Sequence, residues 1–560
     1  MSPAARRTLA GLGGAAAMIA AVTVLSRVLG FARYLVQAHA FQAGSIGGVY
    51  NTANTLPNVL FEVAAGGALA GALVPVLALP VSRALRKDVD AITSATFGWT
   101  LLVLVPLGAA LAACSGLIAS VWPGQLGDAE RDLLQYFIAV FAVQVPMYGV
   151  AVLLYAVLQA HKRFFWPAFA PVLSSLVVIA TYLVYAALAD GELDDPAAVT
   201  SGALAVLGWG TTLGVAAMCF PMFVPVHRLG VRIRPTLRFP AGVGRRLAVL
   251  AFAGIGSLVA QQLSVLVSLV VASARGNVGT WSVFLWSQQV YLLPYAVLVV
   301  PLATSTFPRL AARAASGEHE GFARMASGTT RAVLAAAALG SAALVAAAPA
   351  VTDIFVGIAD GGAGMRAMTT TISWLMPGLL GFALMFHASR ALYALERGRS
   401  AIAANVAGWG TVAVATPVIA AALAPAGDDP DATLLALAQA SSLGMLVGGT
   451  AAVVLLRRAA GRAATAGLVR AAVVLVVGAG LGALVGRWVV DAVAQVAGHG
   501  VLTALGAAAG GGVVAALVVA GAVLVGDRAT LRDFRRLEAE PRPRDAERIP
   551  DPANPSGPLV

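Results

Sequence analysis

The sequence predicts an all-α integral membrane protein with about fourteen transmembrane helices, arranged as two six-helix lobes plus two extra C-terminal helices. Three observations predict this class. Hydrophobic residues make up 59% of the 560 residues and charged residues only 11%, against about 25% charged residues in soluble proteins. The chain divides into apolar runs of about 20 residues or more, the length that a spanning helix needs. The basic residues gather in alternate connections between those runs.

Each predicted span is an apolar run that ends at a charged segment or at a Pro- or Gly-containing break. The runs cover residues 14–40, 47–79, 92–121, 133–160, 166–189, 201–226, 247–274, 281–308, 326–356, 367–394, 401–425, 432–456, 464–488 and 500–526. Several are longer than 20 residues, so they must tilt in the bilayer or protrude from it. The first two runs are separated only by the short segment 44–48.

The basic residues sort to one side of the predicted membrane. With a cytoplasmic N-terminus, 31 of the 37 Lys and Arg residues lie in cytoplasmic segments, and one miscounted helix would invert every later loop. Acidic clusters at 128–132, 190–195 and 428–431 fall on the opposite side. We therefore predict a multi-pass membrane protein with both termini cytoplasmic. The net charge of +11 is then a topology signal and a contact for anionic lipids, and predicts no nucleic-acid partner.

A weak internal repeat predicts the division into lobes. "ALAGALVPVLA" (68–78) and "PLATSTFPRLA" (301–311) agree at five of eleven positions, 233 residues apart, and each precedes a basic loop. Parallel repeats of six helices are a known transporter architecture. The predicted parts are an N-terminal lobe (1–228), a basic cytoplasmic linker (229–246), a C-terminal lobe (247–458), helices 13 and 14 (459–526), and a disordered cytoplasmic tail (527–560).

Two arginines in the first span are the strongest candidates for function. Arg27 and Arg33 interrupt an apolar run, and an arginine near the bilayer centre costs about 2.5–3.5 kcal/mol on insertion scales. One interpretation is that both side chains extend to the membrane surface. The alternative is that both face a water-filled cavity and bind an anion, because a guanidinium presents a planar fork that suits phosphate oxygens. We expect the second arrangement.

A polar stripe in the second span is the next candidate. Asn51, Asn54, Asn58 and Glu62 recur every three or four residues, so they share one helix face. Asparagines can simply hydrogen-bond neighbouring helices. Glu62 is the carboxylate that lies well inside a span, and we expect it to pair with Arg27 or Arg33. In the second half the comparable polar residues are the uncharged Gln261, Gln262, Gln288 and Gln289.

No constellation for catalysis or cofactor binding is evident. The two cysteines, Cys114 and Cys219, lie in apolar runs, and the six histidines are scattered. We find no metal-ligand spacing, no phosphate-binding loop and no nucleophile elbow. The sequence therefore predicts neither an enzyme nor a bound cofactor or metal.

Two stretches, "SRVLGFARYLVQAHAFQAG" and "NTANTLPNVLFEVAAGGALAGALVPVLA", resemble the MurJ/MviN family of lipid II flippases, in the multidrug/oligosaccharidyl-lipid/polysaccharide exporter superfamily. The resemblance implies a V-shaped, two-lobed fold in a bacterial plasma membrane, with a central cationic cavity. It implies alternating access for lipid II or a similar polyprenyl-pyrophosphate lipid, with Arg27 and Arg33 in the cavity and the polyprenyl tail in a groove at 459–526. Alternatives are an exporter of another polyprenyl-linked glycan or a small molecule, and a non-transporting scaffold that recruits cell-wall synthesis proteins.

The chain departs from the family pattern at several cavity positions. Phe61 and Glu62 stand where well-studied members have an arginine pair, and Gln289 stands where they have a cavity arginine. Val267 and Trp409 stand where some members have sodium-binding carboxylates. The resemblance therefore implies a less cationic cavity, in which Asn51, Asn54, Asn58, Glu62 and Gln289 join the two arginines as candidate substrate-binding residues.

Overall fold

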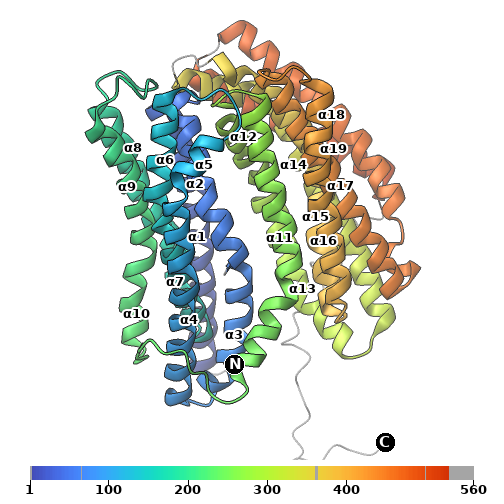
Figure 1. Ribbon diagram of the computed structural model, residues 1–560. Coiled ribbons are helices and arrows are strands. Elements are labelled where there is room, and N and C mark those ends of the chain that lie inside the picture. The colour runs from blue at the N-terminus through green and yellow to red at the C-terminus, as the bar shows by residue number, and fades with distance from the viewer. Residues whose placement is uncertain (1–2, 65, 360–362, 499, 529–560) are drawn as a thin grey trace, which may run out of the picture.

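The computed structural model describes residues 3–64, 66–359, 363–498 and 500–528, and the described part is built from helices. Figure 1 shows the helices in two upright groups, one formed by α1 to α10 and the other by α11 to α19, which we call the first and second bundles. The predicted disordered tail from 529 onward lies outside the described residues.

The helices follow one another with short connections. The first bundle contains α1 (Pro3–Phe41), α2 (Ser45–Ala64), α3 (Gly66–Ser82), α4 (Arg86–Ala113), α5 (Ser115–Val121), α6 (Asp128–Ala142), α7 (Gln144–Ala160), α8 (Phe165–Leu188), α9 (Ser201–Cys219), η1 (Phe220–Met222) and α10 (Phe223–Arg228). The second bundle contains α11 (Val243–Arg275), α12 (Thr280–Pro294), η2 (Tyr295–Val299), α13 (Val300–Ala315), α14 (His319–Ile358), η3 (Ala363–Arg366), α15 (Ala367–Ala394), α16 (Gly398–Leu423), α17 (Pro430–Ala460), η4 (Arg462–Thr465), α18 (Leu468–Ala497) and α19 (Val501–Gly526).

The predicted spans coincide with these helices. Twelve described helices, some of them joined end to end, are long and apolar enough to cross a membrane, and they match the third to the fourteenth predicted spans. The first two predicted spans fall on α1 and on α2 with α3. The all-helical membrane class is confirmed. Some helices extend beyond the approximate predicted limits. α1 begins at Pro3 rather than at 14, and α18 continues past 488 to Ala497. In that last part of α18, Arg487 and Asp491, one turn apart, form an ion pair (3.1 Å).

A tight turn at 42–44 separates α1 from α2. Gln42 has a φ of 51°, in the left-handed region, and the next helix begins at Ser45. Gly44 lies against the carboxylate of Asp194 from the α8–α9 connection, which occupies the space that a Cβ would take. The glycine-rich break in the sequence therefore does separate two antiparallel helices.

The charged residues define two ends of the molecule. Glu130 and Asp194 meet at the start of α2, where Ser45 Oγ donates to Glu130 Oε1 (2.5 Å) and Ile46 N donates to Asp194 Oδ1 (3.3 Å). We call this the acidic end; it is the upper end in Figure 1. At the opposite, basic end, Arg470 at the start of α18 donates from Nε to the carbonyl of Gly526 at the end of α19 (3.1 Å).

The basic linker is attached to the first bundle rather than free. Between α10 and α11 the linker has no helix or strand, and it lies beside α4. Arg232 N donates to Asp90 Oδ1 (2.9 Å), Arg234 N donates to Ser94 Oγ (2.9 Å), and Trp99 Nε1 donates to the carbonyl of Leu237 (3.0 Å). These bonds satisfy backbone groups that would otherwise need water, and they fix where α11 starts.

Glycines bring α18 and α19 into close contact beside α14. An added Cβ on Gly482 would lie 2.6 Å from the carbonyl oxygen of Ala515, and one on Gly486 would lie 2.7 Å from Ala346 of α14. Small residues at such contacts let membrane helices pack through their backbones. The outward faces carry exposed apolar side chains such as Leu484 and Trp488, as expected of surfaces that meet lipid.

Candidate functional site

The uninterrupted helix α1 carries both candidate arginines to the space between the bundles. Arg27 is exposed and Arg33, nearly two turns further on, is half-buried. Arg33 Nη2 donates to the hydroxyl of Tyr34 (3.3 Å), and its guanidinium lies 5.0 Å from the centre of that ring. A single weak bond leaves most of the five guanidinium N–H donors of Arg33 available to another partner.

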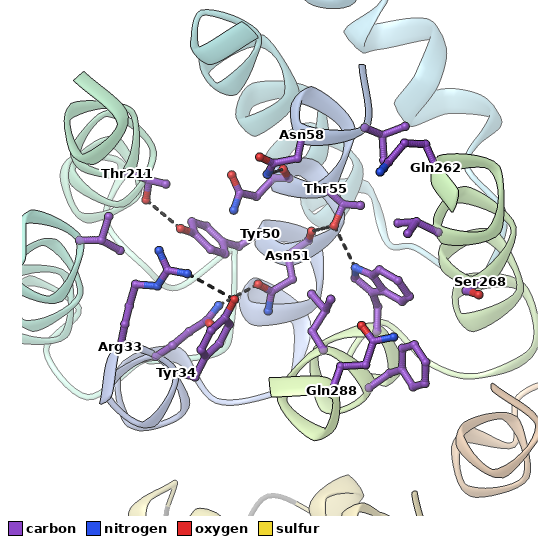
Figure 2. A pocket seen from close by; sticks show the side chains of 18 of the residues that line it. Arg33, Tyr34, Tyr50, Asn51, Thr55, Asn58, Thr211, Gln262, Ser268 and Gln288 are labelled. Carbon is purple, nitrogen blue, oxygen red and sulfur yellow. Dashed lines mark hydrogen bonds between the residues drawn. The ribbon is translucent and has the colours of Figure 1, made fainter. Parts of the chain in front are cut away.

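A cavity of about 290 Å³ lies beside Arg33, between α1, α2 and α12. Figure 2 shows its side chains converging from both bundles, with Asn51, Asn58 and Gln262 among them. Amides, hydroxyls and aromatic rings dominate the lining, so we call it the amide-lined chamber. Of its described lining residues, Arg33 alone carries a charge. Its volume is at the lower end of the roughly 300–1,000 Å³ of small-molecule sites.

A second cavity of about 540 Å³ lies toward the basic end, between α1, α8 and α12. Arg27 and Gln289 line it, so we call it the Arg27 chamber. The two chambers share Arg33, Tyr34, Tyr148 and Ser174 in their walls. Arg33 therefore stands at the junction, where a phosphate in either chamber could reach its guanidinium.

Tyrosines surround Arg33 at this junction. The hydroxyl of Tyr50 lies 3.0 Å from that of Tyr182 and 2.9 Å from Thr211 Oγ1, and both tyrosines line the amide-lined chamber with Tyr148. The ring of Tyr50 also packs edge-on against Phe137 and Phe141, which holds it in place. Sequence reasoning missed these residues, because an aromatic side chain in an apolar run carries no sign that it faces a cavity.

The asparagine stripe of α2 does face the amide-lined chamber, but its members differ in their bonds. Asn51 is 5% exposed and bonded on both sides, to Gln37 and Ser282 (both 2.8 Å). Asn58 Nδ2 donates to the carbonyl of Asn54 one turn earlier (2.8 Å). Asn54 lines the chamber, and its Oδ1 is a buried acceptor without a hydrogen-bond partner within the described residues.

Glu62 differs from the expectation. It lines neither chamber, and across the described parts of the chain no ion pair joins it to Arg27 or Arg33. Its carboxylate lies against Gly66, one turn along the chain. The preceding residue, Phe61, packs on the Tyr148 ring with centroids 5.4 Å apart and closes this side of the chamber. The stripe therefore leaves the cavity after Asn58.

The polar residues of the second bundle are divided between the chambers. Gln262 and Gln288 line the amide-lined chamber, and Gln289 lines the Arg27 chamber. Trp409 of α16 also lines the amide-lined chamber. Asn405, also on α16, lies outside the lining of both chambers, and its Nδ2 donates to Ser389 Oγ of α15 (3.1 Å).

This arrangement suits binding rather than bond-breaking chemistry. Guanidinium groups bind phosphate oxygens through charge-assisted bonds about twice as strong as neutral ones. Amides and hydroxyls offer both donors and acceptors to a polar, uncharged group. The family model of "Lipid II flippase MurJ" matches residues 37–504, most of the chain. The chain belongs to the MurJ family.

Curated MurJ proteins match over part of their length. The lipid II flippase MurJ of Burkholderia cenocepacia is 30% identical over 315 residues, which cover 54% of this chain and 58% of that protein. The probable lipid II flippase MurJ of Rhizobium meliloti is 28% identical over 301 residues, 53% of this chain and 54% of that protein. The chain thus spans a little over half the length of the curated relatives that it matches.

Solved structures show the same fold. A structure of "Lipid II flippase MurJ, inward closed conformation" superposes with a TM-score of 0.68 at 16% identity, over 92% of this chain and 99% of that one. An inward-facing MATE family transporter of the MOP superfamily follows with a TM-score of 0.61 at 12% identity, over 79% and 98%. The chain is therefore a multi-pass membrane protein with the MurJ and MATE fold.

Proposed function

We propose that this MurJ-family protein moves lipid II, the undecaprenyl-pyrophosphate-linked peptidoglycan precursor, from the inner to the outer leaflet by alternating access. The observation that carries the proposal is the position of Arg33 between the two chambers, with Arg27 in the wall of one of them. An intramembrane arginine that faces a cavity marks a path for an anion. Family membership supports lipid II as the cargo.

In this mechanism the pyrophosphate binds the guanidinium groups of Arg27 and Arg33 in place of the water that it loses. The amide-lined chamber receives the polar part of the head group, and Asn54 Oδ1 accepts one of its hydrogen bonds. Residues 1–228 and 247–458 would then rock as two lobes. A membrane potential that is negative inside favours outward movement of an anion by roughly 2.3 kcal/mol per charge per 100 mV.

The proposed orientation places the basic end in the cytoplasm of a bacterium and the acidic end outside the plasma membrane, with both chain termini cytoplasmic. The excess of arginine and lysine in the connections of the basic end supports this orientation. The polyprenyl tail would lie against 459–526, where α18 and α19 present exposed apolar side chains such as Val469 and Leu484.

Another polyprenyl-linked glycan is a second candidate cargo, because the described lining of the amide-lined chamber carries a single charge. An assay of the lipid-linked precursors on each leaflet, after depletion of the protein in its host, distinguishes lipid II from another glycan as the cargo. Accumulation of lipid II on the inner leaflet is the expected result. Accumulation of a different polyprenyl-linked glycan would replace lipid II as the cargo, and unchanged leaflet distributions would contradict transport.

A further inference from the structure

A chain of buried hydrogen bonds links the two bundles beside the amide-lined chamber. Gln37 Nε2 donates to Asn51 Oδ1 (2.8 Å), and Asn51 Nδ2 donates to Ser282 Oγ of α12 (2.8 Å). Ser282 Oγ in turn donates to the carbonyl of Gly47 in α2 (3.1 Å). Asn51 is 5% exposed and Ser282 is fully buried, so water does not compete for these bonds.

Two tryptophans of α12 add hydrogen bonds to side chains of the first bundle. Trp281 Nε1 donates to Thr55 Oγ1 (3.0 Å), and Trp286 Nε1 donates to Gln37 Oε1 (3.3 Å). Both rings are almost completely buried. We call the six residues that make these links across the bundles the amide clasp: Gln37, Asn51, Thr55, Trp281, Ser282 and Trp286.

The bundles also touch through their backbones at the acidic end. An added Cβ on Gly48 of α2 would overlap the carbonyl oxygen of Val278, and one on Gly279 would overlap that of Ala43. Gly124, before α6, meets the carbonyl of Ser273 in the same way and has a φ of 104°. These three contacts leave no space for a side chain at their positions, and a cavity of about 180 Å³ lies beside them between the bundles. We call the three contacts the seal of the acidic end.

We propose that Asn51 is a positioning residue that couples the contents of the amide-lined chamber to the closure of the acidic end. Four members of the amide clasp, namely Gln37, Asn51, Thr55 and Trp281, also line that chamber. A head group rich in hydroxyls and amides binds the same polar atoms that hold the bundles together. The inference rests on the proposed movement of two lobes.

The bonds of Asn51 and Ser282 are buried while the bundles are together. In an empty chamber, separation of the bundles breaks these bonds and leaves only water to replace them, at a net cost of about 0.5–1.5 kcal/mol for each bond. When a polar cargo supplies replacement partners, separation loses few bonds. The seal therefore opens more readily when the chamber is filled, which protects the membrane from opening without cargo.

A matched pair of variants tests this role. Asn51→Leu removes the bonds to Gln37 and Ser282 while the side chain keeps a similar size. Asn58→Leu is the control, since Asn58 lies two turns along the same helix and lines the same chamber, but donates within its own helix. Both are made in a background in which Cys114 and Cys219 are replaced by serine.

Spin labels at Glu192→Cys and Ala426→Cys, exposed positions at the acidic end of the two bundles, report their separation in nanodiscs without added cargo. We expect Asn51→Leu to raise the population with a long distance about tenfold over the cysteine-substituted parent, as the loss of two hydrogen bonds implies. Asn58→Leu should keep the distance distribution of that parent.

The same shift in both variants, or in neither, would overturn the proposal. Ser282→Ala removes the bond between Asn51 and Ser282 and should raise the long-distance population in the same way. This variant provides the test if Asn51→Leu fails to insert into the membrane. The double variant should add little to either single change, because both remove one interaction. The measurement uses no cargo, so failure of the lipid II proposal in the depletion assay leaves its outcome unaffected.

Discussion

Arg33 illustrates how one residue can serve two chambers, because its guanidinium lies in the wall that they share. Arg33→Ala should reduce transport of lipid II by about tenfold to a hundredfold, the value of one charge-assisted hydrogen bond. Protein abundance should stay near that of the wild type, since Arg33 has one weak bond to Tyr34. Complementation of a flippase-depleted strain, with an immunoblot for abundance, measures both.

Arg33→Lys is the matched control for charge. Lysine keeps the positive charge and loses the bidentate fork, so transport should recover only in part. Full activity of Arg33→Ala together with Arg27→Ala would contradict the pyrophosphate-binding role. It would also favour a scaffold, which does not need cavity cations.

Glu62 leads to a different expectation than the sequence alone suggested. A half-buried carboxylate without a basic partner pays for desolvation with no compensating ion pair. Glu62→Gln should therefore raise the thermal midpoint of the protein in detergent, and should leave the pH profile of transport unchanged. A lower midpoint or an altered pH profile would mean that the carboxylate finds a partner during the transport cycle.

Some residues of the site could be found from the sequence and others could not. Arg27 and Arg33 were found because charges are rare and expensive in an apolar run. The asparagines were found by their helical spacing. Tyr50 and Tyr182 were not, since their role depends on the packing of α2, α8 and α9, which bring distant hydroxyls within 3.0 Å of one another.

At the scale of elements, the lengths of the apolar runs predicted which segments span the membrane, but not where a helix is interrupted within a span. The predicted span 133–160 is interrupted at Val143, where α6 ends and α7 begins. Gln144 and Pro146 mark this break, but average hydropathy over the span does not reveal it. The attachment of the linker to α4 was also hidden, since it depends on backbone groups that bond to Asp90 and Ser94. Charge alone predicted a basic linker but not its contacts.

The connection between α8 and α9 is an element with a predicted pH response. The pKa of Asp194 is raised from its ordinary value of 3.8 to about 6. Burial is the main cause, hydrogen bonds from the α2 backbone limit the rise, and the nearby Glu130 adds to it. The folded protein therefore binds a proton more tightly than the unfolded chain between about pH 4 and 6, so stability falls as the pH rises through that window.

Asp194→Asn should abolish this dependence, because the amide still accepts from Ile46 N and no longer titrates. We expect the wild type to unfold at a higher temperature at about pH 5 than at pH 7.5, with a smaller difference in the variant. Asp195→Asn is the control, as its exposed carboxylate accepts from Ala197 N in its own loop. An equal loss of pH dependence in both variants would assign the effect to the loop as a whole.

At the scale of the whole molecule, the two ends have different chemistry. The acidic end brings the bundles together through backbone contacts such as Gly48 with Val278. The basic end carries the arginine-rich connections and the Arg27 chamber lies on its side of Arg33. A cargo that binds from the basic end meets the cations first and the amide clasp last, which is the order that the proposed outward transport requires.

That order holds only if the basic end is cytoplasmic, which is the last prediction. Fusions of an enzyme that is active only outside the cytoplasm should be active at Glu192 and Asp429, and inactive at Arg234 and Arg458. The expectation rests on the excess of basic residues in the connections of one end, which sets orientation during insertion. A cytoplasmic fluorescent reporter at the same four positions is the control and should give the reverse pattern. If all four positions read on the opposite face, the fold would stand but the proposed direction of transport would fail. The membrane potential would then oppose, rather than favour, movement of an anion from the basic end to the acidic end.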